Sequence, residues 1–196
     1  MIIGNNKPIR IIGYSESSMT HEFVNEITKT HAIEIISPSD FLIDSNKQQY
    51  QHIISISWDL LERKKIAEYV DNNNLDLITV VHNTVLLGTT PQAIIQPGTF
   101  IFPFCNISIG STIGRHCIVG SYSLIGHYSH VGSNCLVRPG VMINGKSTVG
   151  KNCIINTRST ITNNAFITDD VEIMAFTNIF KNITSAGRYY SNTRKN

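Results

Sequence analysis

The sequence predicts a small α/β domain followed by a parallel β-helix. Its first part alternates short apolar runs with helical spacing of apolar residues, which is typical of a parallel α/β unit. Its second part places Ile or Val at every sixth residue from position 95 to 179. Only 15% of the 196 residues are charged, and this favours a β-rich body with few long solvated helices.

The α/β domain is expected to span residues 1–88. Short apolar runs predict strands over residues 9–13, 32–36, 53–56 and 77–81. Apolar residues at helical spacing predict helices over residues 19–27 and 59–70, and Asp59 with Glu62 forms a candidate capping box at the start of the second. Strands and helices in this order indicate a parallel sheet.

The β-helix is expected to span residues 89–182, with a C-terminal tail over residues 183–196. The six-residue repeat is carried by Ile95, Ile101, Ile107, Ile113, Val119, Ile125, Val131, Val137, Ile143, Val149, Ile155, Ile161, Ile167, Ile173 and Ile179. Each hexad supplies one short strand and one corner, and three hexads make a coil. The repeat therefore predicts about five coils without an insertion.

All four cysteines fall on a second register of the repeat, four residues after the aliphatic position. Every residue of this register is small: Thr99, Cys105, Ser111, Cys117, Ser123, Ser129, Cys135, Val141, Ser147, Cys153, Ser159, Ala165, Val171 and Thr177. The cysteine spacings of 12, 18 and 18 residues match no zinc motif. We therefore predict that the cysteines are small packing residues.

Charge and hydropathy exclude several classes of partner. The 16 basic and 14 acidic residues are too balanced to indicate nucleic acid or an anionic membrane. No apolar run approaches the ~18 residues of a transmembrane helix, and the first residues do not resemble a secretory signal. We expect a cytoplasmic protein.

Several short stretches carry a resemblance to a known family. They are Gly13–Ser15 after the first strand, Arg63, Val80–His82, Ile125–His127, Val137–Val141, Asn144–Gly145, and Ala186–Tyr190 with Arg194 and Lys195. With the hexads of residues 119–150, they resemble the left-handed β-helix acetyltransferases, the hexapeptide-repeat transferases. The most similar subgroup is the bacterial sialic acid O-acetyltransferases and UDP-amino-sugar N-acetyltransferases, in which a Rossmann-like nucleotide-sugar domain precedes the β-helix. The left hand of the β-helix is implied by this resemblance.

The resemblance implies that His127 is the catalytic residue. Acetyl transfer from a thioester needs a base for the acceptor proton and a donor for the oxyanion. Gly145 follows His127 by 18 residues, which places it above the histidine on the next coil and leaves its N–H as the candidate donor. Tyr128 and His130 are candidates for orienting His127 or binding substrate; the alternatives are a subunit interface for Tyr128 and a solvated corner for His130.

The remaining candidates rest on single residues. Nucleotide-sugar binding is assigned to Gly13, Ser15, Asp40 and Arg63. Coenzyme A binding is assigned to Lys146, Lys151, Arg188 and Arg194. A purely structural turn at Gly13 and a solvated C-terminal tail are the alternatives.

Together these features predict an acetyl-CoA-dependent acetyltransferase that acts on the amino group of a nucleotide-linked deoxysugar in surface polysaccharide biosynthesis. The family implies a homotrimer with active sites between neighbouring prisms, and we expect no metal. A sugar O-acetyltransferase and a non-catalytic β-helix scaffold are the alternatives. A zinc site of the γ-carbonic anhydrase type is disfavoured, because His116, His127 and His130 lie eleven and three residues apart.

Overall fold

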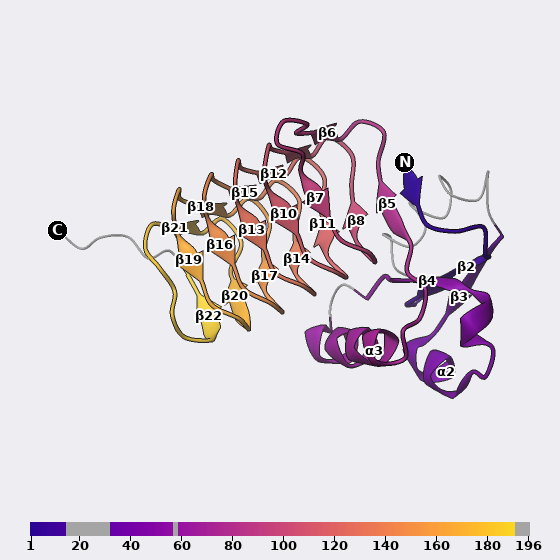
Figure 1. Ribbon diagram of the computed structural model, residues 1–196. Coiled ribbons are helices and arrows are strands. Elements are labelled where there is room, and N and C mark those ends of the chain that lie inside the picture. The colour runs from indigo at the N-terminus through magenta and orange to yellow at the C-terminus, as the bar shows by residue number, and fades with distance from the viewer. Residues whose placement is uncertain (15–31, 57–58, 191–196) are drawn as a thin grey trace. The chain divides into compact units, whose positions relative to one another are not determined.

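The computed structural model describes residues 1–14, 32–56 and 59–190. It divides into two compact units, residues 2–79 and residues 80–196 together with Met1 (Figure 1). The division lies before the expected boundary at residue 88, because Val80 and Val81 already pair with Phe100 and Ile101 of the β-helix. The predicted helix over residues 19–27 lies outside the described residues.

The N-terminal unit contains a parallel sheet in the order β3–β2–β4, formed by Ile33–Ile36, Ile9–Ile12 and Gln51–Ile54. β1 (Ile2–Ile3) precedes it. The predicted fourth strand does not join this sheet: among the described residues, its Leu77 forms one bridge to His52, whereas Val80 and Val81 pair with Phe100 and Ile101 of the β-helix. The described residues thus confirm a small parallel α/β architecture with a sheet of three strands.

The described residues of this unit form three helical segments. The predicted second helix is α3 (Leu60–Asn72), and the Asp59 side chain caps it by accepting a hydrogen bond from the Glu62 N–H at 2.9 Å. Two shorter segments, α2 (Pro38–Ile43) and η1 (Lys47–Gln49), were not predicted, since neither is long enough to show a helical period. Ile66 and Val70 of α3 pack with Phe41, Ile12 and Ile54 in the core of the unit.

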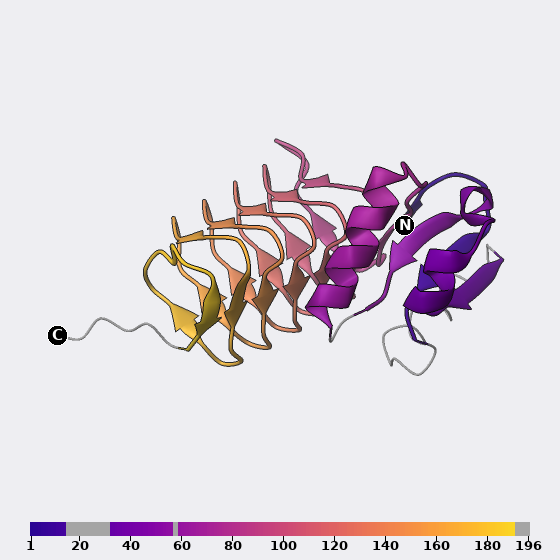
Figure 2. The same cartoon turned by 90° about the horizontal axis from the view of Figure 1, so that it is seen from below.

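The C-terminal unit is a three-sided parallel β-helix (Figures 1 and 2). One sheet contains β5 (Thr79–Val81), β8 (Phe100–Ile101), β11 (Ile118–Val119), β14 (Leu136–Val137), β17 (Ile154–Ile155), β20 (Val171–Ile173) and β22 (Gly187–Tyr189). The second contains β6 (Leu86–Leu87), β9 (Asn106–Ile107), β12 (Leu124–Ile125), β15 (Met142–Ile143), β18 (Thr160–Ile161) and β21 (Asn178–Ile179). The third contains β7 (Ile94–Ile95), β10 (Thr112–Ile113), β13 (His130–Val131), β16 (Thr148–Val149) and β19 (Phe166–Ile167).

The strand register confirms the 18-residue coil, since Val119 pairs with Val137 and Ile125 with Ile143. About six coils are present rather than the five predicted, because β5 and β6 begin a coil before Ile95. The described part of the predicted tail closes the far end: β22 pairs with β20, and Ile183 is buried beside Ile167. Within the described residues, no helix has the length and hydrophobicity needed to cross a bilayer.

Both predicted registers of the hexad line the interior. The aliphatic positions from Ile101 onward are at most 1% exposed, and the four cysteines are free and buried. The small residues also donate hydrogen bonds along the inside: Thr99 to the Gly114 carbonyl at 2.9 Å and Cys117 to the Gly132 carbonyl at 3.1 Å. The prediction of packing cysteines is therefore consistent with their position, and the structure adds this donor role.

The corners follow a rule that the hexad pattern did not reveal. Every sixth residue from 98 to 176 has a positive φ, and only Gly98, Gly110 and Gly140 among these are glycines. Left-handed backbone is costly for residues with a Cβ, and single residues adopt it where the surrounding structure requires it. In this β-helix, pairing of each strand with the coils above and below imposes the positive φ on the corner residues. His116, Tyr128 and Lys146 all lie at such corners.

Candidate active site

The structure brings His127 and Gly145 into contact at the corner between the second and third sheets. A Cβ built on Gly145 would lie 2.3 Å from Cε1 and 2.6 Å from Nε2 of the His127 ring. The imidazole therefore occupies the space that any other side chain at position 145 would need. His127 itself is exposed, so its ring can reach a bound molecule.

The backbone of this corner is held by neighbouring coils. The Lys146 N–H donates to the His127 carbonyl at 2.8 Å, and the Asn164 N–H donates to the Gly145 carbonyl at 3.1 Å. Within the described part of the chain, no group accepts a hydrogen bond from the Gly145 N–H. An exposed imidazole thus lies beside a free backbone donor, and this pairing suits a base and an oxyanion site.

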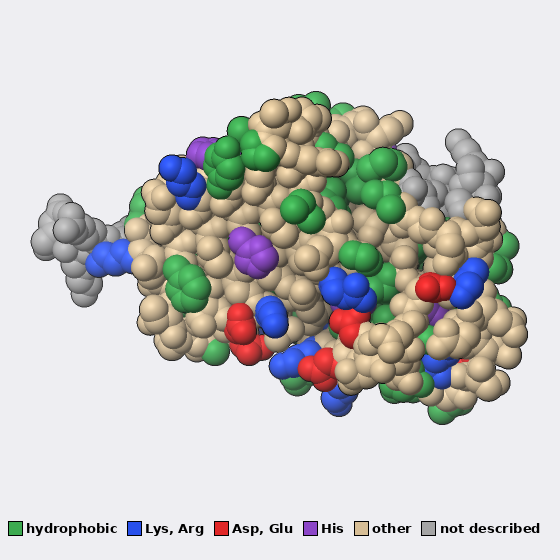
Figure 3. All heavy atoms as spheres, in the orientation of Figure 1, with side chains coloured by type: hydrophobic (Ala, Val, Ile, Leu, Met, Phe, Trp, Pro, Cys, Tyr) green, Lys and Arg blue, Asp and Glu red, His purple; other side chains and the backbone are tan. Residues whose placement is uncertain are grey.

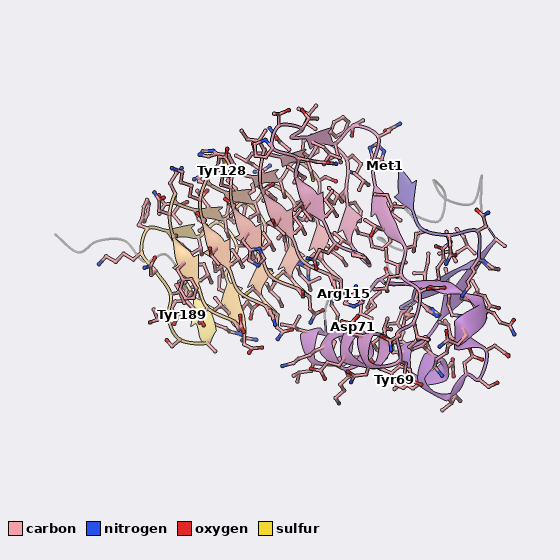
Figure 4. All side chains as sticks on the ribbon, viewed as in Figure 1. Met1, Tyr69, Asp71, Arg115, Tyr128 and Tyr189 are labelled. Carbon is pink, nitrogen blue, oxygen red and sulfur yellow. The ribbon has the colours of Figure 1, made fainter. Side chains whose placement is uncertain are left out.

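Tyr128 adjoins His127 at the same corner, near the outer rim of the coils (Figure 4). The two rings are perpendicular, at 88°, with centroids 5.9 Å apart. The Tyr128 ring lies over Gly110 on the preceding coil, where an added Cβ would approach its Cδ1 to 2.5 Å. Two consecutive side chains are therefore each seated on a glycine of an adjacent coil.

The other two histidines of the β-helix lie apart from this contact. His130 begins β13 and is exposed on the third sheet, in register with Thr112 and Thr148. His116 is buried at the corner between β10 and β11. Among the described residues, no group of three His, Cys, Asp or Glu side chains could hold a metal ion.

Of the coenzyme A candidates, the structure brings only Lys146 to the corner of His127. Lys151 lies at the next corner, where its N–H donates to Asp169 Oδ1 at 2.7 Å. Arg188 lies on β22 and forms an ion pair with Glu172 at 2.7 Å. Arg194 lies outside the described residues.

The nucleotide-sugar candidates belong to the N-terminal unit, and Ser15 lies outside its described residues. Gly13 follows β2, with an ideal Cβ 3.2 Å from Ser55 Cβ. Asp40 is exposed and accepts a hydrogen bond from Ser37 Oγ at the start of α2. Arg63 is fully buried, and its Nη1 donates to the Ile54 and Ile56 carbonyls at 2.9 Å. This placement favours a structural role for Arg63 at the end of β4.

The sequence predictions did not use the distribution of acidic residues in the β-helix, although a residue count reveals it. Residues 80–168 contain no Asp or Glu. The same stretch carries five cations: Arg115, Arg138, Lys146, Lys151 and Arg158. The coils around His127 therefore attract anions and supply no carboxylate to the histidine.

Comparison with known proteins supports the same fold. Residues 128–163 match the family described as bacterial transferase hexapeptide (six repeats). No curated protein sequence matches the chain. Among solved structures, the acetyltransferase domain of PglB from Neisseria gonorrhoeae FA1090 is 18% identical, with a TM-score of 0.84, and the match covers 97% of this chain and 99% of that one.

Two similar structures contain ligands. The same PglB domain in complex with acetyl coenzyme A is 17% identical, with a TM-score of 0.84 and coverage of 97% and 99%. A mutant of perosamine N-acetyltransferase from Caulobacter crescentus, in complex with CoA and GDP-perosamine, is 14% identical, with a TM-score of 0.80 and coverage of 92% of each chain. The fold is thus the predicted left-handed β-helix, and the resemblance to hexapeptide-repeat acetyltransferases is confirmed.

Proposed function

We propose that this hexapeptide-repeat chain is an acetyl-CoA-dependent acetyltransferase that acts on the amino group of a nucleotide-linked deoxysugar for a surface polysaccharide. The observation that carries the proposal is the exposed His127 ring seated on Gly145, beside a backbone N–H free among the described residues. Similar folds bind acetyl coenzyme A in one case, and CoA with GDP-perosamine in another. We place the reaction in the cytoplasm, where both substrates are made.

The reaction is a direct transfer. His127 accepts a proton from the acceptor amine as its nitrogen attacks the carbonyl carbon of the acetyl thioester. The Gly145 N–H donates a hydrogen bond to the oxyanion of the tetrahedral intermediate. Collapse of the intermediate breaks the C–S bond, and the coenzyme A thiolate takes a proton from the imidazolium. No covalent enzyme intermediate forms, and the four buried cysteines take no part.

The charge of the β-helix supports anionic substrates. Acetyl-CoA and a nucleotide sugar both carry phosphates. Five Arg and Lys side chains and no carboxylate occur between residues 80 and 168, so the coils attract both molecules. Lys146, next to Gly145, is the cation best placed to contact a phosphate or the substrate close to His127.

We further propose a homotrimer assembled through the second sheet, which carries His127 at its edge. Leu86 and Met142 point outward from this sheet and are 67% and 43% exposed. Phe104 and Tyr122, at the adjoining corner, stack with centroids 5.0 Å apart and are also exposed. Hydrophobic side chains gather along the upper edge of the β-helix in Figure 3. Exposed apolar side chains gathered in this way favour protein contact, and a neighbouring copy there would lie beside His127.

The proposal is tested by release of the coenzyme A thiol from acetyl-CoA in the presence of different acceptors. The panel contains nucleotide-linked 4-amino deoxysugars, their hydroxyl analogues, sialic acid and no acceptor. Transfer to the amino sugars, with a gained acetyl group seen by mass spectrometry, supports N-acetylation. Transfer to hydroxyl acceptors alone supports an O-acetyltransferase. Absence of transfer to every acceptor by a folded protein supports the non-catalytic scaffold.

A further inference from the structure

His127 has no acidic partner on its own chain. Among the described residues, none forms a hydrogen bond with its imidazole, and residues 80–168 contain no Asp or Glu. A second copy packed against these coils brings the same residues, so it adds no carboxylate from residues 80–168. A histidine that acts as a base needs a fixed ring orientation, which a hydrogen-bonded carboxylate commonly provides. Here another group must provide it.

Two contacts restrict the imidazole in the structure. Gly145 lies against the ring near Cε1 and both nitrogens and leaves no room for a side chain there. Tyr128 lies perpendicular to the ring at a centroid distance of 5.9 Å. Perpendicular aromatic pairs at 4.5–7 Å are attractive, and their geometry is specific.

Tyr128, which is 53% exposed, has a constrained backbone, and its ring is seated on Gly110. Its N–H donates to the Ile109 carbonyl at 2.9 Å, its φ is 55°, and its ring lies over Gly110. Within the described part of the chain, its hydroxyl forms no hydrogen bond. The contact with His127 is therefore made by the ring, so the hydroxyl can be removed without changing it.

We propose that Tyr128 is the positioning residue of His127: its aromatic ring, seated on Gly110, holds the imidazole against Gly145 in place of a carboxylate. This inference rests on the proposed function, since it concerns the orientation of the proposed base. Gly110 acts through Tyr128, because a side chain at position 110 would displace the Tyr128 ring.

The kinetic test compares four variants. Tyr128→Phe keeps the ring and should retain kcat within twofold. Tyr128→Leu and Gly110→Ala should each lower kcat about tenfold, the scale of one aromatic contact, while KM for acetyl-CoA stays within twofold. Gly140→Ala is the matched control for Gly110→Ala. Gly140 has φ +71° against +64° for Gly110, but its added Cβ meets only the Arg158 stem, so kcat should be unchanged.

A second readout does not depend on turnover. Nuclear Overhauser contacts between the ring protons of Tyr128 and His127 should be present in the wild type, Tyr128→Phe and Gly140→Ala. They should be lost in Gly110→Ala. Thermal melts identify any variant that has failed to fold.

The outcomes separate the two proposals. If the wild type transfers no acetyl group, the proposed function fails, while the ring contacts still test the orientation of His127. If His127→Ala abolishes turnover but Tyr128→Leu and Gly110→Ala do not lower it, the positioning role is overturned. If Tyr128→Phe loses as much activity as Tyr128→Leu, the hydroxyl of Tyr128 is required, and the ring contact alone does not position His127.

Discussion

His127 and Gly145 illustrate how a missing side chain determines the position of a functional one. The histidine ring lies where a Cβ at position 145 would be, and Gly126 at the same corner would place a Cβ 2.5 Å from the Gly145 nitrogen. Both glycines are required by close approach of adjacent coils. The Gly145 N–H has no acceptor among the described residues, and Gly126 leaves the space beside it that a side chain would fill.

Replacement of His127 by Ala should lower kcat by roughly 10²–10⁴-fold, about 3 to 5 kcal/mol of barrier, because general base catalysis is lost. Affinity for acetyl-CoA, measured by calorimetry, should change little, since the base acts on the acceptor in the transition state. His130→Ala is the control, because His130 lies on the outer surface of β13 and should cost less. Near-normal turnover in His127→Ala together with loss of turnover in His130→Ala would show that His127 is not the general base.

Substitution at Gly145 tests both the position of the His127 ring and the role of the Gly145 N–H. Gly145→Ala keeps the N–H but should displace the His127 ring, because the added Cβ would lie 2.3 Å from its Cε1. Gly145→Pro removes the N–H as well and should lower kcat further, since the oxyanion donor is lost. Steady-state kinetics on the two folded variants measure the steric and donor contributions in turn. Equal turnover in both variants would contradict the donor role of the N–H.

His52 makes the stability of the N-terminal unit depend on pH. Its side chain is buried, Nε2 lies 2.9 Å from the Lys47 carbonyl, and Nδ1 has no partner among the described residues. Burial lowers the pKa of His52 from 6.5 to about 4. The unfolded chain therefore binds a proton that the folded chain excludes between these pH values, and stability falls as the pH is lowered from 6.5 to 4.

The contribution of His52 amounts to about 3 kcal/mol across that interval. His52→Gln, whose amide can still donate to the Lys47 carbonyl, should flatten this part of the pH dependence. Urea unfolding at pH 7, 5.5 and 4 measures it in both proteins. Identical pH dependence in the two proteins would mean that other groups cause the loss of stability.

At the scale of the element, small polar residues join many corners of the β-helix to the next coil. Ser129 Oγ donates to the Asn144 carbonyl at 2.9 Å and accepts from the Ser147 N–H at 3.3 Å. Cys135 donates in the same way to the Gly150 carbonyl at 3.1 Å. A hydroxyl or thiol in this register therefore satisfies a backbone carbonyl inside the prism, where water is excluded.

Cys135 allows this role to be separated from catalysis. Cys135→Ser keeps a donor to Gly150, whereas Cys135→Ala leaves that carbonyl without it and should cost about 1 kcal/mol of unfolding free energy more than Ser. Both variants should retain kcat, because the thiol is buried far from solvent and burial raises its pKa. Chemical denaturation and steady-state assays test this. Loss of turnover in a folded Cys135→Ser variant would indicate a catalytic or metal role.

At the scale of the whole molecule, the proposed trimer has a direct test. Light scattering at micromolar concentration should give about three times the 21.8 kDa of the chain. Leu86→Lys places a charge on the exposed surface of the second sheet and should dissociate the assembly, because burying an unpaired ammonium is costly. Ile94→Lys, which replaces an exposed apolar residue on the third sheet, is the control for added charge alone.

A wild-type monomer that persists at micromolar concentration would contradict both the trimer and an active site shared between copies. If Leu86→Lys dissociates the trimer, turnover should fall with it, although His127 is unchanged. Full activity in the dissociated variant would show that one chain contains the complete site.

The sequence alone determined the β-helix, its 18-residue coil, its interior and the pairing of His127 with Gly145. This was possible because each residue of a solenoid contacts its equivalent one coil away, so a spacing along the chain becomes a contact in space. The tertiary structure was needed for the contacts that do not follow from this 18-residue spacing. It showed that Val80 and Val81 open the first coil, that Arg63 is buried on the carbonyls of Ile54 and Ile56, and that the Tyr128 ring lies perpendicular to the His127 ring. These depend on side-chain direction and on packing between non-repeating segments, which residue spacing does not encode.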